Sequence, residues 1–309
     1  MSAIALPPQL TVFVRDWLSS NQVLLKGGEG AVLIDAGYTR HAPLTLALLA
    51  SERGVREGEL AVLVNTHCHS DHMGGNAAIA RHHGCRIEIP VGEAALIEAW
   101  DTRTLLLDYA DQAAERFRVD GTLAPGDVRT WGALEWQCIA APGHDMGALV
   151  FFNPEHGILV SGDALWEYGF GFVMPPEMDP AALPATRATL EAIARLPVRI
   201  VIPGHGNVFA GAEAALERAF RRVDAFAADP ERMARHALKV IFAFALLDKQ
   251  RIAVAGLPAY FDRVGVYRDF NARFFRQPAA KLAEWIVHDL EVAGAAVRDG
   301  EWVRPLANA

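Results

Sequence analysis

Hydrophobic residues follow two different periods along the chain, and the change of period separates strands from helices. Between residues 10 and 37, short β-prone apolar runs are separated by the turn-like segments SSN and GGEG, which predicts a meander of strands that opens a sheet. Residues 40–53 and 74–84 have helical spacing, and Gly84 predicts the end of the second helix. The continuous apolar run at 61–65 predicts a buried strand between these two helices.

The middle of the chain repeats this alternation of strands and helices. Residues 91–118 predict a helical stretch without a clear strand partner, and residues 128–164 return to strand patterns. Helices are expected at 180–195 and at roughly 211–228, on either side of the strand VRIVIP. A chain that alternates strands and helices in this way predicts an α/β fold.

Beyond about residue 230 the pattern becomes helical, so we divide the chain into a main domain, 1–229, and a C-terminal region, 230–309. Three helical segments are followed by an Asp-Gly pair between two short β-prone runs, which is the signal of a two-residue hairpin. Three helices and a hairpin resemble a winged helix. A helical cap packed on the main domain explains the same apolar helices equally well.

Composition limits the classes of protein that fit. Of the 309 residues, 52% are hydrophobic and 21% charged, as in an ordinary globular protein, and the net charge of −8 disfavours a broad nucleic-acid-binding face. The cysteines Cys68, Cys85 and Cys138 are too few for a disulfide framework, so we expect free thiols. We find no signal peptide and no uninterrupted apolar run of about 18 residues, which predicts a cytoplasmic protein that does not enter a membrane.

Four potential metal ligands lie within six residues, directly after the strand at 61–65. His67 and His69 project to the same side of an extended segment and can share one ion. Asp71 and His72 follow as the chain turns into the next helix, where they can face a second ion. Imidazole and carboxylate ligands suit zinc, and also iron or manganese.

Three further segments repeat the arrangement of an apolar strand, a small-residue turn and a ligand. They end in His144, Asp163 and His205. Open sheets present functional groups at strand ends, where loops are free of packing demands. The other histidines have no comparable setting, and we assign them to packing or to the surface: His41, His82, His83, His156, His236 and His288.

This pattern, His-x-His-x-Asp-His followed by a distant His, an Asp and a final His, resembles the metallo-β-lactamase superfamily across residues 10–210. The resemblance implies a four-layer αβ/βα sandwich in which residues 1–229 form the catalytic domain. It also implies two divalent ions, with zinc favoured. One ion would be held by His67, His69 and His144, the other by Asp71, His72 and His205, and Asp163 would bridge them.

Departures from individual subfamilies narrow the reaction. His69 stands where flavo-diiron oxidoreductases carry a glutamate, and Asp163 stands where many β-lactamases have a cysteine or no bridging acid. The residues after His144 and His205 do not match the glutathione-thioester motifs of glyoxalase II. Asp35 lies where the family often places a carboxylate that orients a ligand.

The resemblance therefore predicts a dinuclear-metal hydrolase that cleaves a carboxylic ester, thioester or lactone with a hydroxide shared by the ions. Asp71 can also guide a proton to the leaving group, and Tyr168 resembles the lactonase tyrosine that donates to an oxyanion. The same loop offers apolar side chains for an acyl group, unless it is simply buried beneath the C-terminal helices. These side chains are Trp166, Phe170, Phe172 and Met174.

Two alternatives remain open beside this small-molecule acyl hydrolase. One is a phosphodiesterase or ribonuclease, because some relatives with winged-helix tails are nucleases, although the tail arginines 263, 268, 273 and 276 lie among acids. The loops 65–76, 142–149, 161–176 and 203–209 contain no Lys or Arg, which disfavours a polyanionic substrate. The other alternative is a non-catalytic binding protein that retains the metals. The apolar tail must be covered, either at the substrate pocket or in a homo-oligomer.

Overall fold

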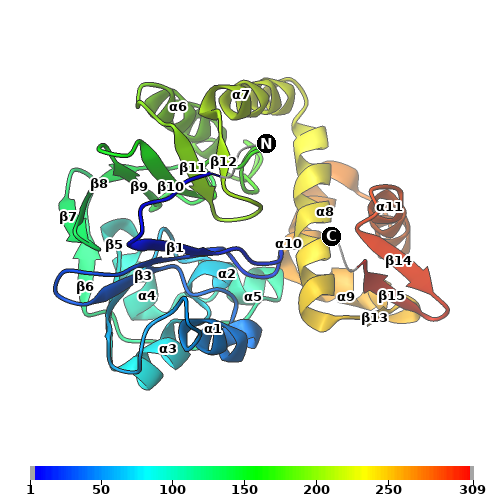
Figure 1. The fold of residues 1–309 in the computed structure, drawn as a ribbon. Helices are drawn as coiled ribbons and strands as arrows, with labels where there is room; N and C mark the ends of the chain where they lie inside the picture. The colour runs from blue at the N-terminus through cyan, green and yellow to red at the C-terminus, as the bar shows by residue number, and fades with distance from the viewer. Residues whose placement is uncertain (1–3, 307–309) are drawn as a thin grey trace.

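A computed structural model describes residues 4–306 and contains two six-stranded sheets that face each other, with helices on both outer faces (Figure 1). This arrangement is the expected four-layer αβ/βα sandwich. The first sheet contains β1 (Leu10–Phe13), β2 (Gln22–Leu25), β3 (Ala31–Ile34), β4 (Leu60–Val64), β5 (Arg86–Pro90) and β6 (Gly121–Leu123), in that order. The second contains β12 (Phe209–Ala210), β11 (Ile200–Pro203), β10 (Ile158–Gly162), β9 (Leu149–Asn153), β8 (Leu134–Ala140) and β7 (Val128–Trp131).

Both sheets mix antiparallel and parallel strands. In the first sheet, β1, β2 and β3 form the expected antiparallel meander, and β3 to β6 are parallel. In the second sheet, β7 to β10 are antiparallel, β10 and β11 are parallel, and β12 closes the edge. Because β4, β10 and β11 each lead into a predicted ligand segment, the sheets bring distant parts of the sequence to one end of the sandwich.

The strands are apolar on both faces because each sheet is covered on both sides. Val23 and Leu25 of β2 lie in the core between the sheets, and Leu24 between them lies in the core beneath the outer helices. Side chains alternate along a strand, so a continuous apolar run is what a doubly covered sheet requires.

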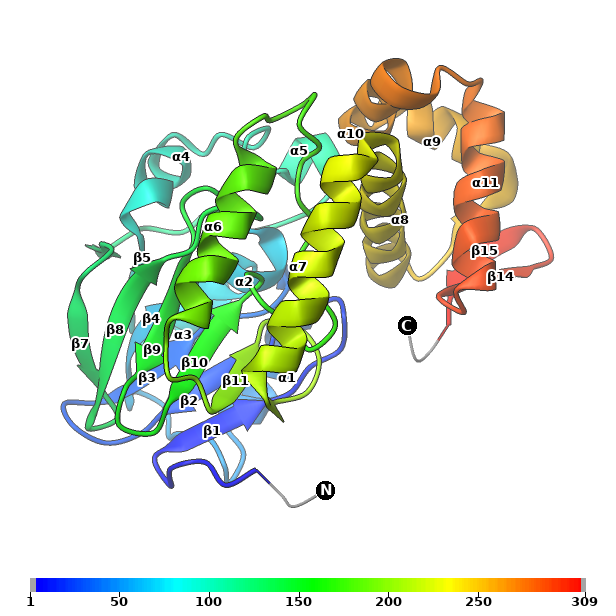
Figure 2. The ribbon, with the colours of Figure 1, turned by 90° about the horizontal axis from the view of Figure 1, so that it is seen from above.

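Helices cover the outer face of each sheet. The first sheet is covered by η1 (Thr39–His41), α1 (Ala42–Leu49), α2 (Ser70–Met73), α3 (Asn76–His83), η2 (Val91–Glu93) and α4 (Ala94–Ala99). The second sheet is covered by α6 (Ala182–Ala194) and α7 (Ala212–Ala228), which lie side by side in Figure 2. Gly84 ends α3 in the left-handed conformation, at φ 68°, as its position in the sequence predicts.

The expected helical stretch at 91–118 is broken into short pieces, which corrects the sequence interpretation. The backbone is left-handed at Trp100, Leu106 and Asp111, so α4 stops early and α5 (Leu107–Ala110) is a single turn. None of these residues is a glycine, and the apolar spacing therefore gave no sign of the breaks.

The C-terminal region begins with α8 (Pro230–Lys249), whose first turn is capped by the Asp229 side chain. It continues with β13 (Ile252–Ala253), η3 (Val254–Gly256), α9 (Leu257–Arg263), α10 (Gly265–Phe270), the π-turn η4 (Asn271–Phe275), α11 (Ala279–Val292), β14 (Ala296–Asp299) and β15 (Trp302–Pro305). The expected hairpin is present as β14 and β15. The single middle helix is instead two, because Val264 is extended.

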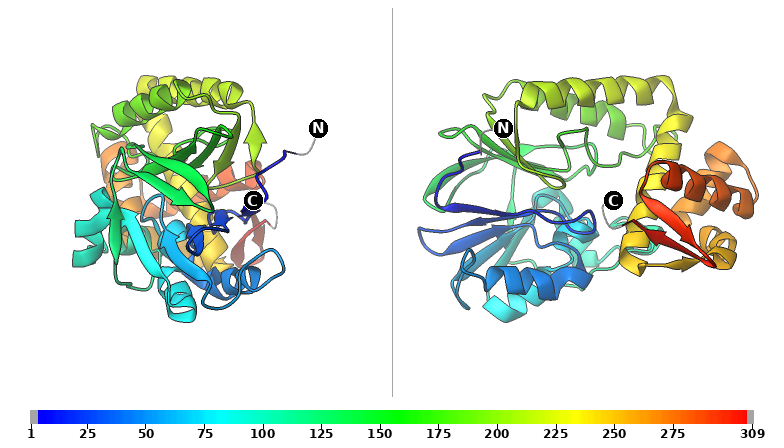
Figure 3. Two further views of the ribbon diagram at one scale, coloured as in Figure 1. Left: turned by 60° about the vertical axis from the view of Figure 1, so that its left-hand side comes forward. Right: turned by 45° about the vertical axis from the view of Figure 1, so that its right-hand side comes forward.

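These C-terminal elements pack on the open end of the sandwich. Figure 3 shows α7 leading into α8, which stands across that end. Their core includes Tyr109, Ala110 and Phe172 of the main domain, so the tail and the sandwich share one apolar cluster. Among residues 4–306, no helix is long and apolar enough to cross a membrane.

Candidate metal centre

The structure brings all seven predicted ligands together at one end of the sandwich, although they come from four separate segments that follow strands. His67 and His69 follow β4, and α2 presents Asp71 and His72 immediately afterwards. The other three follow strands of the second sheet, His144 after β8, Asp163 after β10 and His205 after β11. The side chains fall into two groups, His67 with His69 and His144, and Asp71 with His72, Asp163 and His205; within each group the ligand atoms lie within 4.8 Å of one another.

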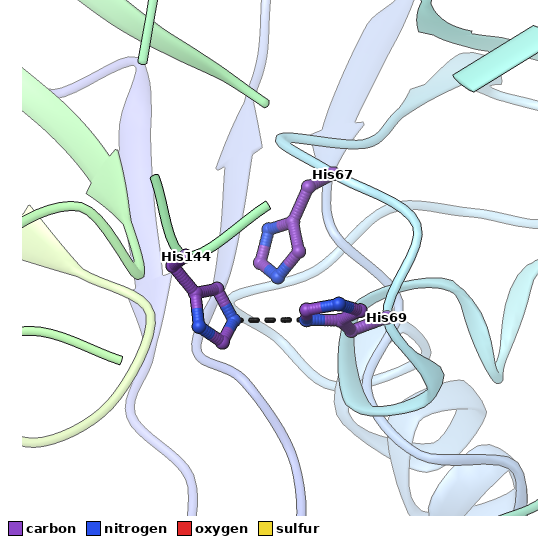
Figure 4. A group of neighbouring side chains, drawn as sticks. All are labelled: His67, His69 and His144. Atoms are coloured by element: carbon purple, nitrogen blue, oxygen red, sulfur yellow. Dashed lines mark hydrogen bonds between the residues drawn. The ribbon is translucent and has the colours of Figure 1, made fainter. Parts of the chain in front are cut away.

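The first group consists of three imidazoles that point toward one another (Figure 4). The Nδ1 atom of His69 lies 2.8 Å from Nε2 of His144, and the ring of His67 lies 4.7 Å from that of His69. Three imidazole nitrogens around a common point are a typical set of zinc ligands.

Asp163 lies between the two groups and reaches both. Its Oδ2 atom is 3.4 Å from Nε2 of His144 in the first group, and its Oδ1 atom is 3.4 Å from Nε2 of His72 in the second. Oδ1 also lies 3.9 Å from Nε2 of His205, which in turn is 2.9 Å from Oδ2 of Asp71. One carboxylate thus faces both candidate ion positions with different oxygen atoms.

The buried nitrogens of this cluster fit divalent metal ions. The Nε2 atoms of His67 and His72 are buried and have no hydrogen-bond partner among the described residues, which is costly unless another ligand satisfies them. Burial and the neighbouring imidazoles hold the pKa of His67 well below its usual range, and burial lowers the pKa of His69 to about 4. These two imidazoles are neutral at pH 7, which is the form that binds a metal.

Contacts behind the ligands fix which nitrogen faces the ions. Nδ1 of His72 donates to Oδ2 of Asp35 at 2.8 Å, and Asp35 also accepts from the backbone N and the hydroxyl of Thr66. Nδ1 of His144 donates to the carbonyl oxygen of Phe172. In the neutral form of either histidine, Nε2 therefore has its lone pair toward the cluster. Although burial opposes them, the carboxylates of Asp35, Asp163 and Asp71 raise the pKa of His72, so metal binding there must displace a proton. Asp35 holds a left-handed backbone, at φ 61°, an unusual conformation for a residue with a side chain.

Two carboxyl groups behind the cluster, those of Asp145 and Glu93, were not singled out by the sequence analysis. Oδ2 of Asp145 lies 3.6 Å from Nε2 of His69, on the side away from His144. Glu93 is buried behind Asp145, and burial followed by that negative charge raises its pKa to about 9. Glu93 is therefore a neutral acid at pH 7. The position of Asp145 directly after His144 is the one signal in the sequence that could have drawn attention to it.

A family comparison agrees with this geometry. Residues 15–205 match the model of the metallo-β-lactamase superfamily, and this range contains all seven candidate ligands and the strands β2 to β11. The chain belongs to the metallo-β-lactamase superfamily. The fold expected from the ligand pattern is confirmed by this match.

Relatives of this superfamily member include hydrolases. It is 31% identical over 164 residues to a hydroxyacylglutathione hydrolase of Rhodobacter capsulatus, covering 52% of this chain and 54% of that protein. It is 28% identical over 210 residues to the acyl-coenzyme A thioesterase MBLAC2 of Bos taurus, covering 63% and 75%. The chain thus spans about half the length of the bacterial relative. A solved metallo-β-lactamase family protein of Thermus thermophilus aligns over 98% of this chain and 100% of its own, with a TM-score of 0.57 and 22% identity, which supports the fold.

Five of the candidate ligands of this superfamily protein form one side of a pocket of about 580 Å³, namely His69, Asp71, His144, Asp163 and His205. The opposite wall comes from α8, which contributes Val240, Ile241, Phe244 and Leu247. Ligand pockets are mostly apolar with a few placed polar groups, and this pocket has that character. The C-terminal region therefore closes the site.

The loop after Asp163 supplies the side wall. The four apolar side chains expected near the metals, Trp166, Phe170, Phe172 and Met174, all line the pocket. Nε1 of Trp166 donates to Oδ1 of Asp163 at 3.2 Å. Tyr168 lies at the rim with 70% of its surface exposed, and the guanidinium of Arg218 covers its ring at 5.1 Å.

Three pocket residues were missed or misplaced by the sequence interpretation. Trp17 stacks on the ring of His205 at 5.4 Å. His236 lines the pocket from α8, so its assignment to packing or to the surface is incomplete. Arg222 of α7 also lines the pocket: the four loops carry no Lys or Arg, as the sequence shows, and a neighbouring helix supplies a cation.

Proposed function

We propose that this chain is a dinuclear-metal hydrolase that cleaves a carboxylic ester, a thioester or a lactone. The observation that carries the proposal is a complete set of seven metal ligands, five of which form one side of a 580 Å³ pocket whose opposite wall is apolar. Two relatives support the acyl class, because their names describe the hydrolysis of hydroxyacylglutathione and of acyl-coenzyme A.

In this proposal residues 1–229 provide the catalytic domain, and residues 230–309 complete the substrate pocket. Two divalent ions, zinc by preference and iron or manganese as alternatives, would supply an activated water and polarise the acyl carbonyl. His67, His69 and His144 would hold one ion, Asp71, His72 and His205 the other, and Asp163 both. The apolar side chains of α8 exclude water around the acyl group, which strengthens electrostatic interactions within the site.

Two side chains of this chain have proposed roles beyond metal binding. Oδ2 of Asp71 lies 2.9 Å from Nε2 of His205, and we assign to the Asp71 carboxylate the transfer of a proton toward the leaving group. The Tyr168 hydroxyl at the rim is assigned to the oxyanion that develops on the substrate. Its exposure means that a substrate must bring the loop and the hydroxyl closer.

The substrate class is tested by a side-by-side assay of the zinc-loaded and the manganese-loaded protein. We expect kcat/KM for aryl esters, acyl thioesters or lactones to exceed that for bis-aryl phosphodiesters and single-stranded RNA by at least about tenfold. The reason is that the loops around the site offer no groove of Lys and Arg to bind a polyanion. The variant Asp71→Ala should abolish the acyl activity. The control variant Glu177→Ala, at an exposed residue, should keep it.

Larger kcat/KM values for the phosphodiesters or for RNA, lost in Asp71→Ala and in His72→Ala, would replace the acyl assignment by the nuclease alternative. Absence of turnover on every compound, in protein that retains two ions, would favour the non-catalytic binding protein.

A further inference from the structure

Arg222 is a cation without a partner in a largely apolar pocket. Among residues 4–306, its guanidinium makes no ion pair and no hydrogen bond. Its neighbours on α7 differ: Arg218 donates to the carbonyl oxygen of Glu167 at 2.8 Å, and Arg221 lies 3.7 Å from Glu217. A half-buried charge is rarely left unpaired, because its desolvation is costly.

The guanidinium of Arg222 is held in place by the loop after Asp163. A Cβ atom added to Gly169 would lie 2.3 Å from Nη1 of Arg222, so the guanidinium packs directly on the glycine backbone. Its carbon lies 5.7 Å from the centre of the Phe170 ring. Burial lowers the pKa of Arg222, and the side chain still remains charged at neutral pH.

His236 of α8 stands near this cation and lines the same pocket. Burial, followed by the positive charge of Arg222, lowers the pKa of His236 to about 4. The imidazole is therefore neutral at pH 7 and can donate one hydrogen bond. The two side chains together offer a single positive charge and one further donor.

This pair lines the same pocket as five of the candidate metal ligands. A Cβ atom on Gly171 would lie 2.7 Å from Nδ1 of His144, and only Phe170 separates Gly171 from Gly169. Because Arg222 lines the same pocket as the candidate ligands His144 and Asp163, one substrate in that pocket can contact both the guanidinium and the ion positions.

We propose that Arg222 and His236 bind a carboxylate of the substrate, so that the hydrolase acts on an acyl compound with an anionic group near the cleaved bond. That the bound carboxylate belongs to a substrate rests on the proposed function. That Arg222 and His236 bind a carboxylate does not. Arginine is suited to carboxylates by its planar fork of donors. A carboxylate matches the single positive charge of this pair, whereas a phosphate dianion calls for more.

The first test is binding to the metal-loaded full-length protein, measured by calorimetry with 4-phenylbutyrate and its neutral amide. We expect the wild type to bind the acid about tenfold more tightly than the amide, because a charge-assisted hydrogen bond is stronger than a neutral one. Arg222→Met keeps the aliphatic stem and should lose this preference. Arg221→Met, on the same helix, is the matched control and should keep it.

An acid preference that survives in Arg222→Met would mean that the carboxylate binds elsewhere, for example at the ions, and would overturn the inference. Arg222→Lys tests the same point if the methionine variant does not fold, since retention of part of the preference is expected with the charge.

The second test locates the carboxylate on the substrate. One pair of thioesters carries it on the thiol, S-acetyl-3-mercaptopropionate and its amide, and the other carries it on the acyl group, a succinyl and a butanoyl ester of one neutral thiol. Arg222→Met should raise KM about tenfold for the acid of one pair, with kcat unchanged. Turnover of both acids without any response to Arg222 would overturn the inference. Lack of turnover of all four compounds would contradict the thioester part of the proposed function and leave the calorimetric result to decide the subsite.

Discussion

Replacing Asp163 with Ala is expected to reduce metal binding at both positions and to lower kcat/KM by more than about 100-fold, beyond the effect of removing a residue that only orients a ligand. The reason is geometric: the two oxygens of Asp163 face different groups, with His144 on one side and His72 on the other. Elemental analysis should find two ions per wild-type chain and fewer than one per variant chain. Glu177→Ala, which removes an exposed acid from the same loop, should bind both ions.

His205→Ala provides the contrast for this prediction. His205 belongs to the second group of candidate ligands, where it contacts Asp71 and Asp163. Its loss should therefore chiefly weaken binding of the second ion. The bridging assignment is wrong if Asp163→Ala and His205→Ala lose the same single ion. The dinuclear assignment is wrong if the wild type holds no more than one ion after metal is resupplied.

Asp35→Ala is expected to lower metal affinity and activity by about 10- to 100-fold, although Asp35 touches neither ion position. Its carboxylate accepts from Nδ1 of His72 and from two donors of Thr66. Without it, His72 is free to rotate and to change tautomer, so Nε2 no longer points at the second ion. The measurement is metal affinity by competition with a chelator, together with kcat/KM.

A positioning role for Asp35 differs from a purely structural one in where the loss appears. The second ion should be weakened more than the first, and high metal concentration should restore part of the activity. A variant that unfolds at lower temperature but binds both ions as the wild type does would show that Asp35 only stabilises the fold.

The ligand cluster could be predicted because it is local in sequence pattern, even though it is distant in space. Each ligand follows an apolar strand and a small-residue turn, and the strand ends then bring them together whatever the details of packing. The meander, the helix stop at Gly84 and the final hairpin followed from residue types that have few backbone alternatives.

The pocket was less predictable, because it depends on how helices pack against one another. Arg222 and His236 lie on the ordinary amphipathic helices α7 and α8, and only the packing of these helices against the sandwich places both side chains at the pocket. Apolar spacing marks the buried face of each helix without saying which neighbour it meets. The breaks near Trp100 and Val264 were missed for a related reason, since both residues are tolerated in helices and their backbone conformations are set by tertiary contacts.

The assembly of the metal centre from strand ends also bears on how the protein folds. Its contacts close long loops, with a sequence separation of 75 from His69 to His144 and of 134 from Asp71 to His205. Contacts this distant in sequence cost chain entropy that is regained only when both sheets are in place, so the centre should form after the folding transition state. Metal should then slow unfolding and leave the refolding rate nearly unchanged, which stopped-flow kinetics with and without zinc can measure. A refolding rate that rises with zinc would place the centre in the nucleus instead. The ions would accordingly lower the unfolding rate of the folded protein, and so determine how long the two sheets remain packed together.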